Sequence, residues 1–259
     1  MSNKTLEKSN FLLEEMNAME VRNKIDENTI AITVFGACEN HGDHMPFGSD
    51  FIFPMELAKR ISIKRNNTIV LPLVPYGVSN HHNEIQMTIS LEANTIINLI
   101  QDIFSSLIKN GIKRILILNG HDGNIAPLEI ASRKIKDKHP QVTIACLESW
   151  WELIGNIKNN LFEEWKGYGH GGEAETSGML AVRQDLVDMK HAPETTIPKL
   201  PQNVRIYWKI NELTNSGATG ASKMATEKKG QITLEILEDL LISFIDKMDE
   251  NKWQYGIKL

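Results

Sequence analysis

The chain has 259 residues, of which 41% are hydrophobic and 24% are charged, and it carries a net charge of −5. This apolar content is sufficient for a hydrophobic core and excludes a globally disordered protein, while the lack of a basic patch argues against a nucleic-acid partner. No apolar run approaches the ~20 residues that span a bilayer. The N-terminal residues lack the apolar stretch of a signal peptide, so we expect a cytoplasmic protein without membrane contact.

The first half of the chain alternates strands and helices. In chain order, the apolar spacing predicts a helix over 4–22, a strand over 29–36, a helix over 50–64, a strand over 68–77, a helix over 90–111, a strand over 113–124, a helix over 125–140 and a strand over 141–149. Pro54 is expected in the first turn of its helix, and Ser90 and Gly111 as the N-cap and the stop of the next one. The crossover lengths favour parallel pairing of the strands.

The second half of the chain is less regular. In chain order, we expect a helix over 150–165, a glycine-rich stretch over 167–187 that becomes helical near Glu173, a long loop region over 190–221 with one strand at 203–210, and a C-terminal helix over 221–251 interrupted near Gly230. No linker or composition shift marks a boundary. We therefore predict one domain over 1–259 with a three-layer α/β/α fold around a mostly parallel sheet.

Metal-capable side chains cluster after the predicted strands and in the later glycine-rich loop. The clusters contain Glu39, His41, His44 and Asp50, then His121 and Asp122, then His170, Glu173 and Glu175. Ligands bind beyond the carboxyl ends of parallel strands, so these residues are expected to converge at one edge of the sheet. Imidazoles mixed with carboxylates suit Zn²⁺, Mn²⁺ or Fe²⁺, and several carboxylates allow two metals to share one of them. Hydrogen-bonding loop histidines remain the alternative interpretation of the pattern.

Four segments resemble the signatures of the creatininase (creatinine amidohydrolase) family. CENHGDHMPFGSD (38–50) resembles the family's E-x-H-G-x-H-L-P-x-x-x-D, and NGHDGN (119–124) resembles its N-G-H-G-G-N. HGGEAETSG (170–178) resembles H-A-G-E-x-E-T-S, and SGATGASKMATEKKG (216–230) is similar to a late G-x-x-G-x-P-x-x-A-T-x-E-K-G stretch. The segments occur in the family's order and extend over most of the chain.

The resemblance implies a metal-dependent amidohydrolase, in which a water that bridges two divalent metal ions hydrolyses the C–N bond of a small-molecule amide. Zinc is expected first, with manganese or iron as alternatives. By motif match, Glu39 and His121 would bind one metal, His41 the other, and Asp50 would bridge them. His170 would transfer a proton. The family resemblance also implies a homo-oligomer, often a hexamer.

The chain departs from true creatininases at two places. Gly123 stands where those enzymes have a metal-binding Glu, so Glu173 is expected as the missing ligand, with Glu175 holding His170 or another ligand in place. The Trp-Asp pair that precedes the catalytic histidine is also missing, since residues 166–169 read KGYG. Creatinine itself is therefore doubtful as the substrate.

Further residues are candidates for the substrate pocket. They are Asp122, His82, Tyr168 and His44, of which His44 is expected in the pocket wall or behind the ligands rather than on a metal. Asp122 has an equal alternative as a turn residue that holds its own loop. Cys38 is expected to be a small buried side chain rather than a nucleophile.

The substrate stays open. A cyclic amide, a formamide of flavin or deazaflavin biosynthesis, a peptide terminus and a carbocyclic sugar derivative all fit branches of the family. A hypothesis of a different class is a non-catalytic α/β protein that binds a small molecule, which loss of the metal ligands would favour.

Overall fold

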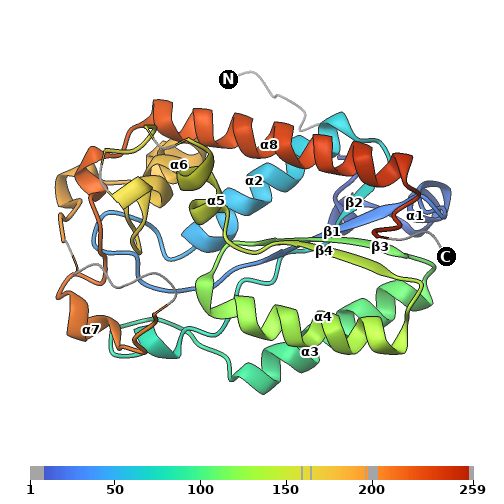
Figure 1. Cartoon of the computed structure of the whole chain (residues 1–259), viewed down its shortest axis with the longest axis horizontal. Coiled ribbons are helices and arrows are strands. Elements are labelled where there is room, and N and C mark those ends of the chain that lie inside the picture. Colours follow the sequence, from blue (N-terminus) through green and yellow to red (C-terminus); the bar gives the residue numbers. More distant parts are fainter. Residues whose placement is uncertain (1–8, 159, 164, 196, 198–203, 257–259) are drawn as a thin grey trace.

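A parallel β-sheet forms the centre of the computed structural model, which describes residues 9–158, 160–163, 165–195, 197 and 204–256 (Figure 1). Its order is β2-β1-β3-β4, with every neighbouring pair parallel. The strands are β1 (Ile30–Phe35), β2 (Thr68–Val70), β3 (Arg114–Asn119) and β4 (Thr143–Leu147). All six residues of β1 are buried, which is why this stretch reads as an unbroken apolar run.

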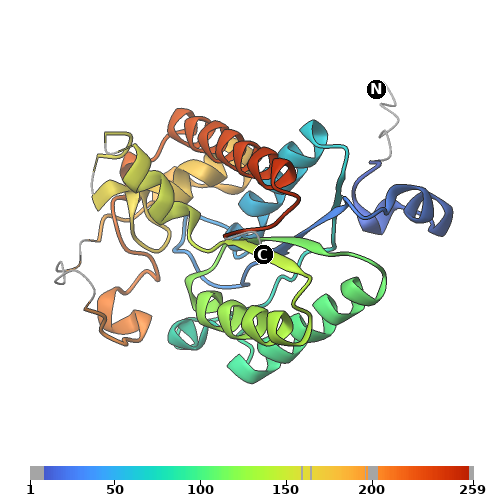
Figure 2. The same cartoon turned by 45° about the vertical axis from the view of Figure 1, so that its right-hand side comes forward.

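Helices cover both faces of the sheet. One face carries α2 (Ser49–Lys64), α6 (Glu173–Arg183) and α8 (Glu227–Glu250), with α5 (Trp150–Ile157) beside them; the other carries α3 (Ala93–Lys109) and α4 (Ile125–Lys138) (Figures 1 and 2). A hydrophobic core lies on each face of the sheet, and successive residues of β1 point to opposite faces. Ile32 and Val34 pack in the core on the α2 side, and Ala31 and Phe35 pack in the core on the α3 side. The three-layer α/β/α prediction is confirmed. Among the described residues, no helix is long and apolar enough to cross a membrane.

The N-terminal prediction was partly wrong. Residues 4–8 lie outside the described part of the chain, and the rest of the expected helix divides into a 3-10 turn (Leu13–Glu15) and α1 (Ala18–Lys24). Asn17 separates them, because its side chain accepts hydrogen bonds from the backbone N–H groups of Met19 and Glu20 and so begins a new helix. The N-cap expected at Ser90 was also wrong: α3 begins after Glu92.

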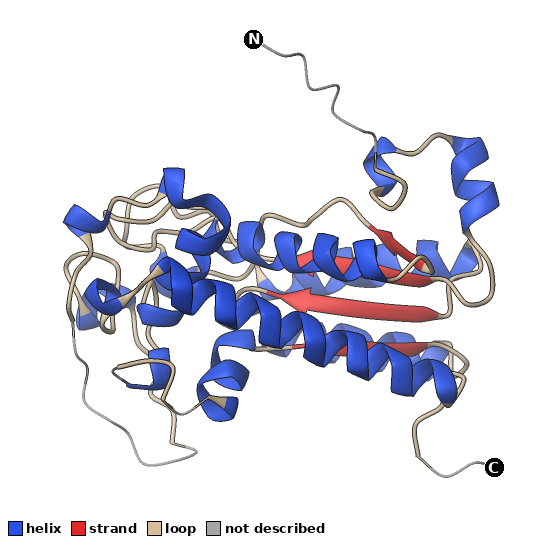
Figure 3. Cartoon of the chain, turned by 90° about the horizontal axis from the view of Figure 1, so that it is seen from above, coloured by secondary structure: helices blue, strands red, loops and turns tan. Residues whose placement is uncertain are grey.

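Two predictions for the second half were wrong as well. The strand expected over 203–210 begins outside the described residues, and 204–209 form no strand there; α7 (Ile210–Leu213) follows (Figure 3). The helix α8 continues through Gly230 without a break. The glycine there serves close packing against α6 and does not interrupt the helix. A Cβ at that position would lie 1.8 Å from the carbonyl oxygen of Ser177 on α6.

The start of α2 sits directly on the ends of β1 and β3. Pro54 is the sixth residue of α2 rather than a residue of its first turn, and it has no N–H to offer the carbonyl of Asp50. Gly36 and Gly120, which follow β1 and β3, pack against this carbonyl, and a Cβ at Gly120 would lie 1.7 Å from it. The two glycines thus let Asp50 reach the edge of the sheet.

Candidate metal centre

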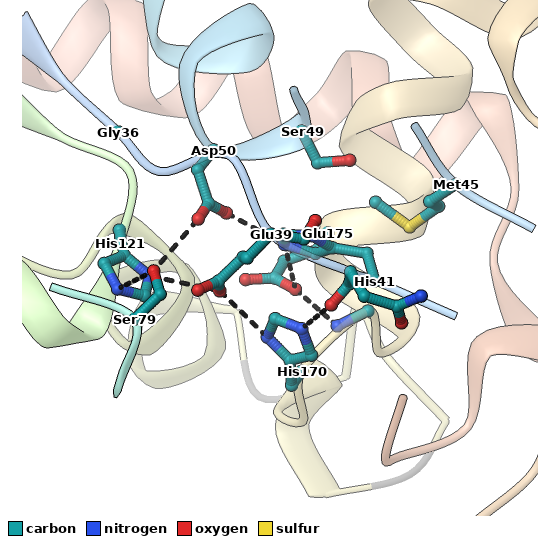
Figure 4. A network of polar contacts seen from close by, with 12 residues as sticks. Gly36, Glu39, His41, Met45, Ser49, Asp50, Ser79, His121, His170 and Glu175 are labelled. Carbon is teal, nitrogen blue, oxygen red and sulfur yellow. Dashed lines mark hydrogen bonds and ion pairs between the residues drawn. The ribbon is translucent and has the colours of Figure 1, made fainter. Parts of the chain in front are cut away.

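The candidate site lies where β1 and β3 end side by side (Figure 4). The crossover after β1 leaves through α2 on one face, and the crossover after β3 leaves through α4 on the other. This point of divergence opens a crevice in doubly wound sheets and is their usual ligand-binding position. The loop of residues 36–48, the first turn of α2 and the loop after β3 all meet there.

Glu39, Asp50 and His121 form one group of possible metal ligands. The Nδ1 atom of His121 lies 3.2 Å from Glu39 Oε1 and 3.2 Å from Asp50 Oδ2. The opposite ring nitrogen, Nε2, lies 2.9 Å from the carbonyl oxygen of Val78. A carbonyl only accepts hydrogen bonds, so it fixes the tautomer with the proton on Nε2 and leaves Nδ1 as the lone-pair donor.

His41, Asp50 and Glu175 form a second group that shares Asp50. His41 Nε2 lies 2.9 Å from Asp50 Oδ1 and 3.9 Å from Glu175 Oε2. Its Nδ1 lies 3.1 Å from the carbonyl oxygen of Glu39, which orients the ring in the same way as Val78 orients His121. Asp50 therefore presents Oδ2 to one group and Oδ1 to the other, which is the arrangement of a carboxylate that bridges two cations.

The donor atoms fit divalent metal ions. Glu39 is 1% exposed and Asp50 is 4% exposed, so both carboxylates are almost removed from water. Glu39 Oε2 and Asp50 Oδ2 make no hydrogen bond with any described residue. Buried carboxylate oxygens require a partner of positive charge, and imidazole with carboxylate oxygen is the ligand set of zinc and its neighbours.

Protons on histidine can balance the charge of the buried carboxylates. Burial opposes the charged form of His41, but the carboxylate of Asp50 outweighs it and raises the pKa of this imidazole to about 10. Burial likewise opposes charge on His121, and Glu39 raises its pKa well above the usual range. Burial would raise the pKa of Glu39, yet the neighbouring His121 and His82 hold it well below its ordinary value. The site therefore has the electrostatics of a cation-binding centre.

The structure separates the two acidic residues at the start of α6. Glu175 belongs to the second ligand group, and burial raises its pKa to about 7. Glu173, the expected ligand, lies elsewhere: its carboxylate accepts hydrogen bonds from Lys229 Nζ at 2.5 Å and from the backbone N–H of Glu163 at 3.0 Å. Residues two positions apart on a helix point about 200° apart, so only one of the two acids can face the site.

Gly123 cannot carry the carboxylate that true creatininases have at this place. A Cβ at this position would lie 1.9 Å from the carbonyl oxygen of Val78 and 2.6 Å from His121 Nε2. The same carbonyl that orients His121 thus excludes a side chain at 123. A second-group carboxylate must come from another element, and α6 provides Glu175.

His170 forms a third group of possible ligands with Glu39 and His41, and it lies beside the two groups that share Asp50. Its Nδ1 is 3.6 Å from Glu39 Oε1, and its Nε2 is 2.5 Å from the carbonyl oxygen of Asn40. The ring packs against those of His41 and His82, with centroids 4.2 and 4.1 Å away. Burial and the nearby His41 lower the pKa of His170 to about 4. A neutral ring with Nε2–H bound to a carbonyl offers Nδ1 to the site as a proton acceptor.

The four residues expected in the substrate pocket lie in different places. His82 is buried at the site, with Nε2 4.0 Å from Glu39 Oε1. His44 stands behind the ligands, where its Nε2 is 2.9 Å from Thr176 Oγ1 and burial lowers its pKa to about 4. The hydroxyl of Tyr168 points away, donating to Asn156 on α5, and Asp122 is an exposed residue of a 3-10 turn.

Two further aromatic residues contact the site that the sequence did not indicate. The ring of His81 stacks on that of His121, with a centroid distance of 5.8 Å. Trp208 meets His81 edge to face at 5.4 Å and His82 at 6.2 Å. His81 was visible only as the neighbour of His82, and the segment that carries Trp208 reads as a strand. Cys38 is half-buried, and burial and the adjacent Glu39 raise its thiol pKa, which disfavours the thiolate.

Comparison with known proteins identifies what this arrangement resembles. The family model described as creatininase, creatinine amidohydrolase, matches residues 14–245. A creatinine amidohydrolase of Pseudomonas putida is 29% identical over 220 residues, which cover 78% of this chain and 82% of that protein. A 3-dehydro-scyllo-inosose hydrolase of Thermotoga maritima is 25% identical over 70% of this chain and 58% of its own length. A solved manganese form of creatininase has a TM-score of 0.78 at 25% identity, covering 93% of this chain and 98% of that one.

Proposed function

Since the chain belongs to the creatininase family, we infer that it is a metal-dependent amidohydrolase, and we propose that it binds two divalent ions in the two groups that share Asp50. The observation that carries this proposal is the position of Asp50, whose two carboxylate oxygens face His41 and His121 from the first turn of α2. Zinc is the metal we expect first, and manganese and iron suit the same donors.

Each ligand role is assigned from the geometry of one side chain. Glu39 and His121 would hold the first ion, and His41 would hold the second. We assign the remaining ligand to Glu175 in place of Glu173, because Glu175 faces Asp50 whereas Glu173 accepts hydrogen bonds from Lys229. Ions bound there would supply Lewis acidity, which activates water and polarises an amide carbonyl.

His170 would transfer the proton during hydrolysis. Its Nε2 is committed to the carbonyl of Asn40, so Nδ1 is the nitrogen that faces the ligand groups. We propose that Nδ1 accepts a proton from the attacking water and then gives it to the leaving nitrogen. Glu175 would contribute to the same chemistry indirectly, because its Oε2 accepts the N–H of Gly171 at 2.6 Å and so ties α6 to the His170 loop.

The substrate class we propose is a small-molecule amide whose C–N bond is cleaved. Creatinine is one candidate, since the relative with the higher identity is a creatinine amidohydrolase. Residues 166–169 lack the Trp-Asp pair, and the aromatic rings of His81 and Trp208 lie beside the site. These differences favour a cyclic amide other than creatinine itself.

A metal-reconstitution experiment tests the proposal. The purified chain is stripped with a chelator, reloaded with zinc, manganese or iron, and analysed for metal content per chain. Each form is then incubated with creatinine, small lactams and formamides while ammonia, amine or formate is measured. Two ions per chain with metal-dependent turnover would support the proposal. Stoichiometric ligand binding without metal would instead favour a small-molecule-binding protein.

We also propose that the chain acts in the cytoplasm as a homo-oligomer, with a hexamer as the expected form. The family resemblance supports the assembly, and the absence of a disulfide between Cys38 and Cys146 agrees with a reducing compartment. Light scattering coupled to gel filtration measures the assembly directly. A monomer at micromolar concentration would contradict it.

A further inference from the structure

The segment from Ser216 to Ser222 lies against the loop that carries His170. It has no role in the metal binding or the proton transfer proposed above. It belongs to the late sequence signature, yet none of its side chains is in a ligand group. Thr219 is 3% exposed and Ser222 is fully buried. Both polar side chains therefore need partners within the protein, and the identity of these partners shows what the segment does.

Thr219 binds both peptide groups of His170. The backbone N–H of His170 donates to Thr219 Oγ1 at 3.0 Å, and the backbone N–H of Thr219 donates to the carbonyl of His170 at 2.8 Å. One residue thus fixes His170 on both sides of its Cα, through one side-chain and one backbone hydrogen bond. The His170 backbone fixes the position of its Cβ, and the carbonyl of Asn40 fixes which ring nitrogen faces the site. This pair of bonds therefore sets the point from which Nδ1 reaches the site.

Ser222 fixes the next peptide group along the loop. Its hydroxyl donates to the carbonyl of Gly171 at 2.7 Å, and the same carbonyl accepts from Thr176 Oγ1 at 2.9 Å. The N–H of Gly171 donates to Glu175 Oε2. The two successive residues of the loop are therefore held from the late segment, and the second of them holds the proposed ligand Glu175.

The segment is itself held in place by backbone hydrogen bonds to Thr195. Gly220 exchanges two backbone hydrogen bonds with Thr195, at 3.1 and 2.6 Å. Gly220 also packs closely against the loop: a Cβ there would lie 2.6 Å from the carbonyl oxygen of Tyr168, and its φ of +92° favours glycine. The hydroxyl groups of Thr219 and Ser222 thus project from a fixed backbone rather than from a free loop.

We propose that Thr219 and Ser222 are positioning residues, which hold the backbone of His170 and Gly171 so that the His170 ring and the Glu175 carboxylate face Glu39 and His41. The proposal rests on the function proposed above, and it assigns a role to residues that touch neither metal nor substrate. It explains why the late signature accompanies the metal-binding motifs although it contributes no ligand.

The test replaces the Thr219 hydroxyl while keeping the shape of the side chain. Thr219→Val removes the acceptor for the His170 N–H, and Thr219→Ser restores it without the methyl group. We expect Thr219→Val to keep its metal content and its KM for the amide that the wild-type enzyme hydrolyses fastest. We expect kcat to fall by roughly 10–100-fold, the effect of a misplaced catalytic group. Thr219→Ser should recover kcat to within about threefold, and Ser222→Ala should behave like Thr219→Val.

Ser216→Ala is the matched control, because Ser216 begins the same segment and its hydroxyl hydrogen-bonds with Thr214 rather than with the His170 loop. A second measurement does not depend on activity. Hydrogen–deuterium exchange of the His170 amide should be at least about tenfold faster in Thr219→Val than in wild type and Thr219→Ser, with exchange in β1 and β3 unchanged.

The outcomes separate the two proposals. A wild-type enzyme that hydrolyses no amide would count against the proposed function, while the exchange experiment would still decide the role of Thr219. If Thr219→Val keeps kcat within twofold of wild type, or if Thr219→Ser loses as much kcat as Thr219→Val, the positioning role is overturned. Unchanged exchange at His170 in Thr219→Val would overturn it as well.

Discussion

Exchanging each acid of α6 for its amide should have opposite effects on stability and metal binding. Burial raises the pKa of Glu175 to about 7, so folding favours its protonated form. A carboxyl group with a raised pKa contributes stability that is fully present below its unfolded pKa near 4.5 and is lost as the pH rises through 7. At pH 8 that loss is on the order of 3 kcal/mol in the metal-free protein. Glu175→Gln removes the loss and should raise the metal-free melting temperature.

The same substitution should weaken metal binding. Glu175 contributes one of the three side chains of the second ligand group, and Gln lacks its charge. Removing a ligand should cost at least the ~10–100-fold in affinity that an outer partner of a ligand costs. We expect one tightly bound ion per chain in Glu175→Gln after dialysis, and turnover close to background.

Glu173→Gln should lower the stability of the protein and leave its metal binding unchanged. Glu173 is fully buried and pairs with Lys229, so its loss leaves a largely buried ammonium group. Breaking such a pair costs about 3–5 kcal/mol, and we expect the lower end because Lys229 keeps the carboxylate of Glu163 and the carbonyl of Met224. The melting temperature should fall by roughly 6–12 °C, at about 2–4 °C per kcal/mol.

Elemental analysis and thermal unfolding with and without metal, at pH 8, distinguish the two variants. Glu173→Gln should retain the wild-type metal content despite its lower melting temperature. If Glu173→Gln loses an ion while Glu175→Gln keeps both at wild-type affinity, the assignment of the ligand to Glu175 is refuted. Equal metal contents in all three proteins would refute a ligand role for either acid.

Four further predictions concern other parts of the site. His121→Ala should lose metal and activity while its circular dichroism matches wild type; full metal content would contradict the assignment of His121. Metal uptake should strengthen as the pH rises toward 10, since the His41 proton, held by a pKa of about 10 next to Asp50, must leave; calorimetry in buffers of different ionisation enthalpy counts the released protons. The stability that this proton gives the metal-free protein is complete below pH 6.5 and is lost as the pH rises through 10. Gly123→Ala should destabilise the protein by about 2 kcal/mol or more in denaturant unfolding, because its Cβ would overlap the Val78 carbonyl. Cys38→Ser should keep kcat within about twofold, because the raised thiol pKa leaves little thiolate; a large loss of kcat would reopen a nucleophilic role.

Local sequence carried most of the information about the sheet and the first ligands. The largely apolar runs within 29–36 and 113–124 contain β1 and β3, because a strand buried on both faces is apolar at most of its positions. Glu39, His41 and Asp50 lie within twelve residues of one another, so a single loop and helix start bring them together whatever the distant chain does. The predicted helix boundaries near Asn17 and Ser90 were wrong, because a single capping residue is a weak indicator of where a helix begins.

The choice between Glu173 and Glu175 depended on the tertiary structure. The two acids are two residues apart and equally acidic in sequence, but the rotation of α6 against α8 turns one toward Lys229 and the other toward His41. The contacts of Thr219 with His170 and of Trp208 with His81 likewise join residues far apart in the chain. The sequence alone determined which side chains can bind metal, because ligand chemistry belongs to the residue. Which of them face the same point was decided only by helix rotation and long-range packing.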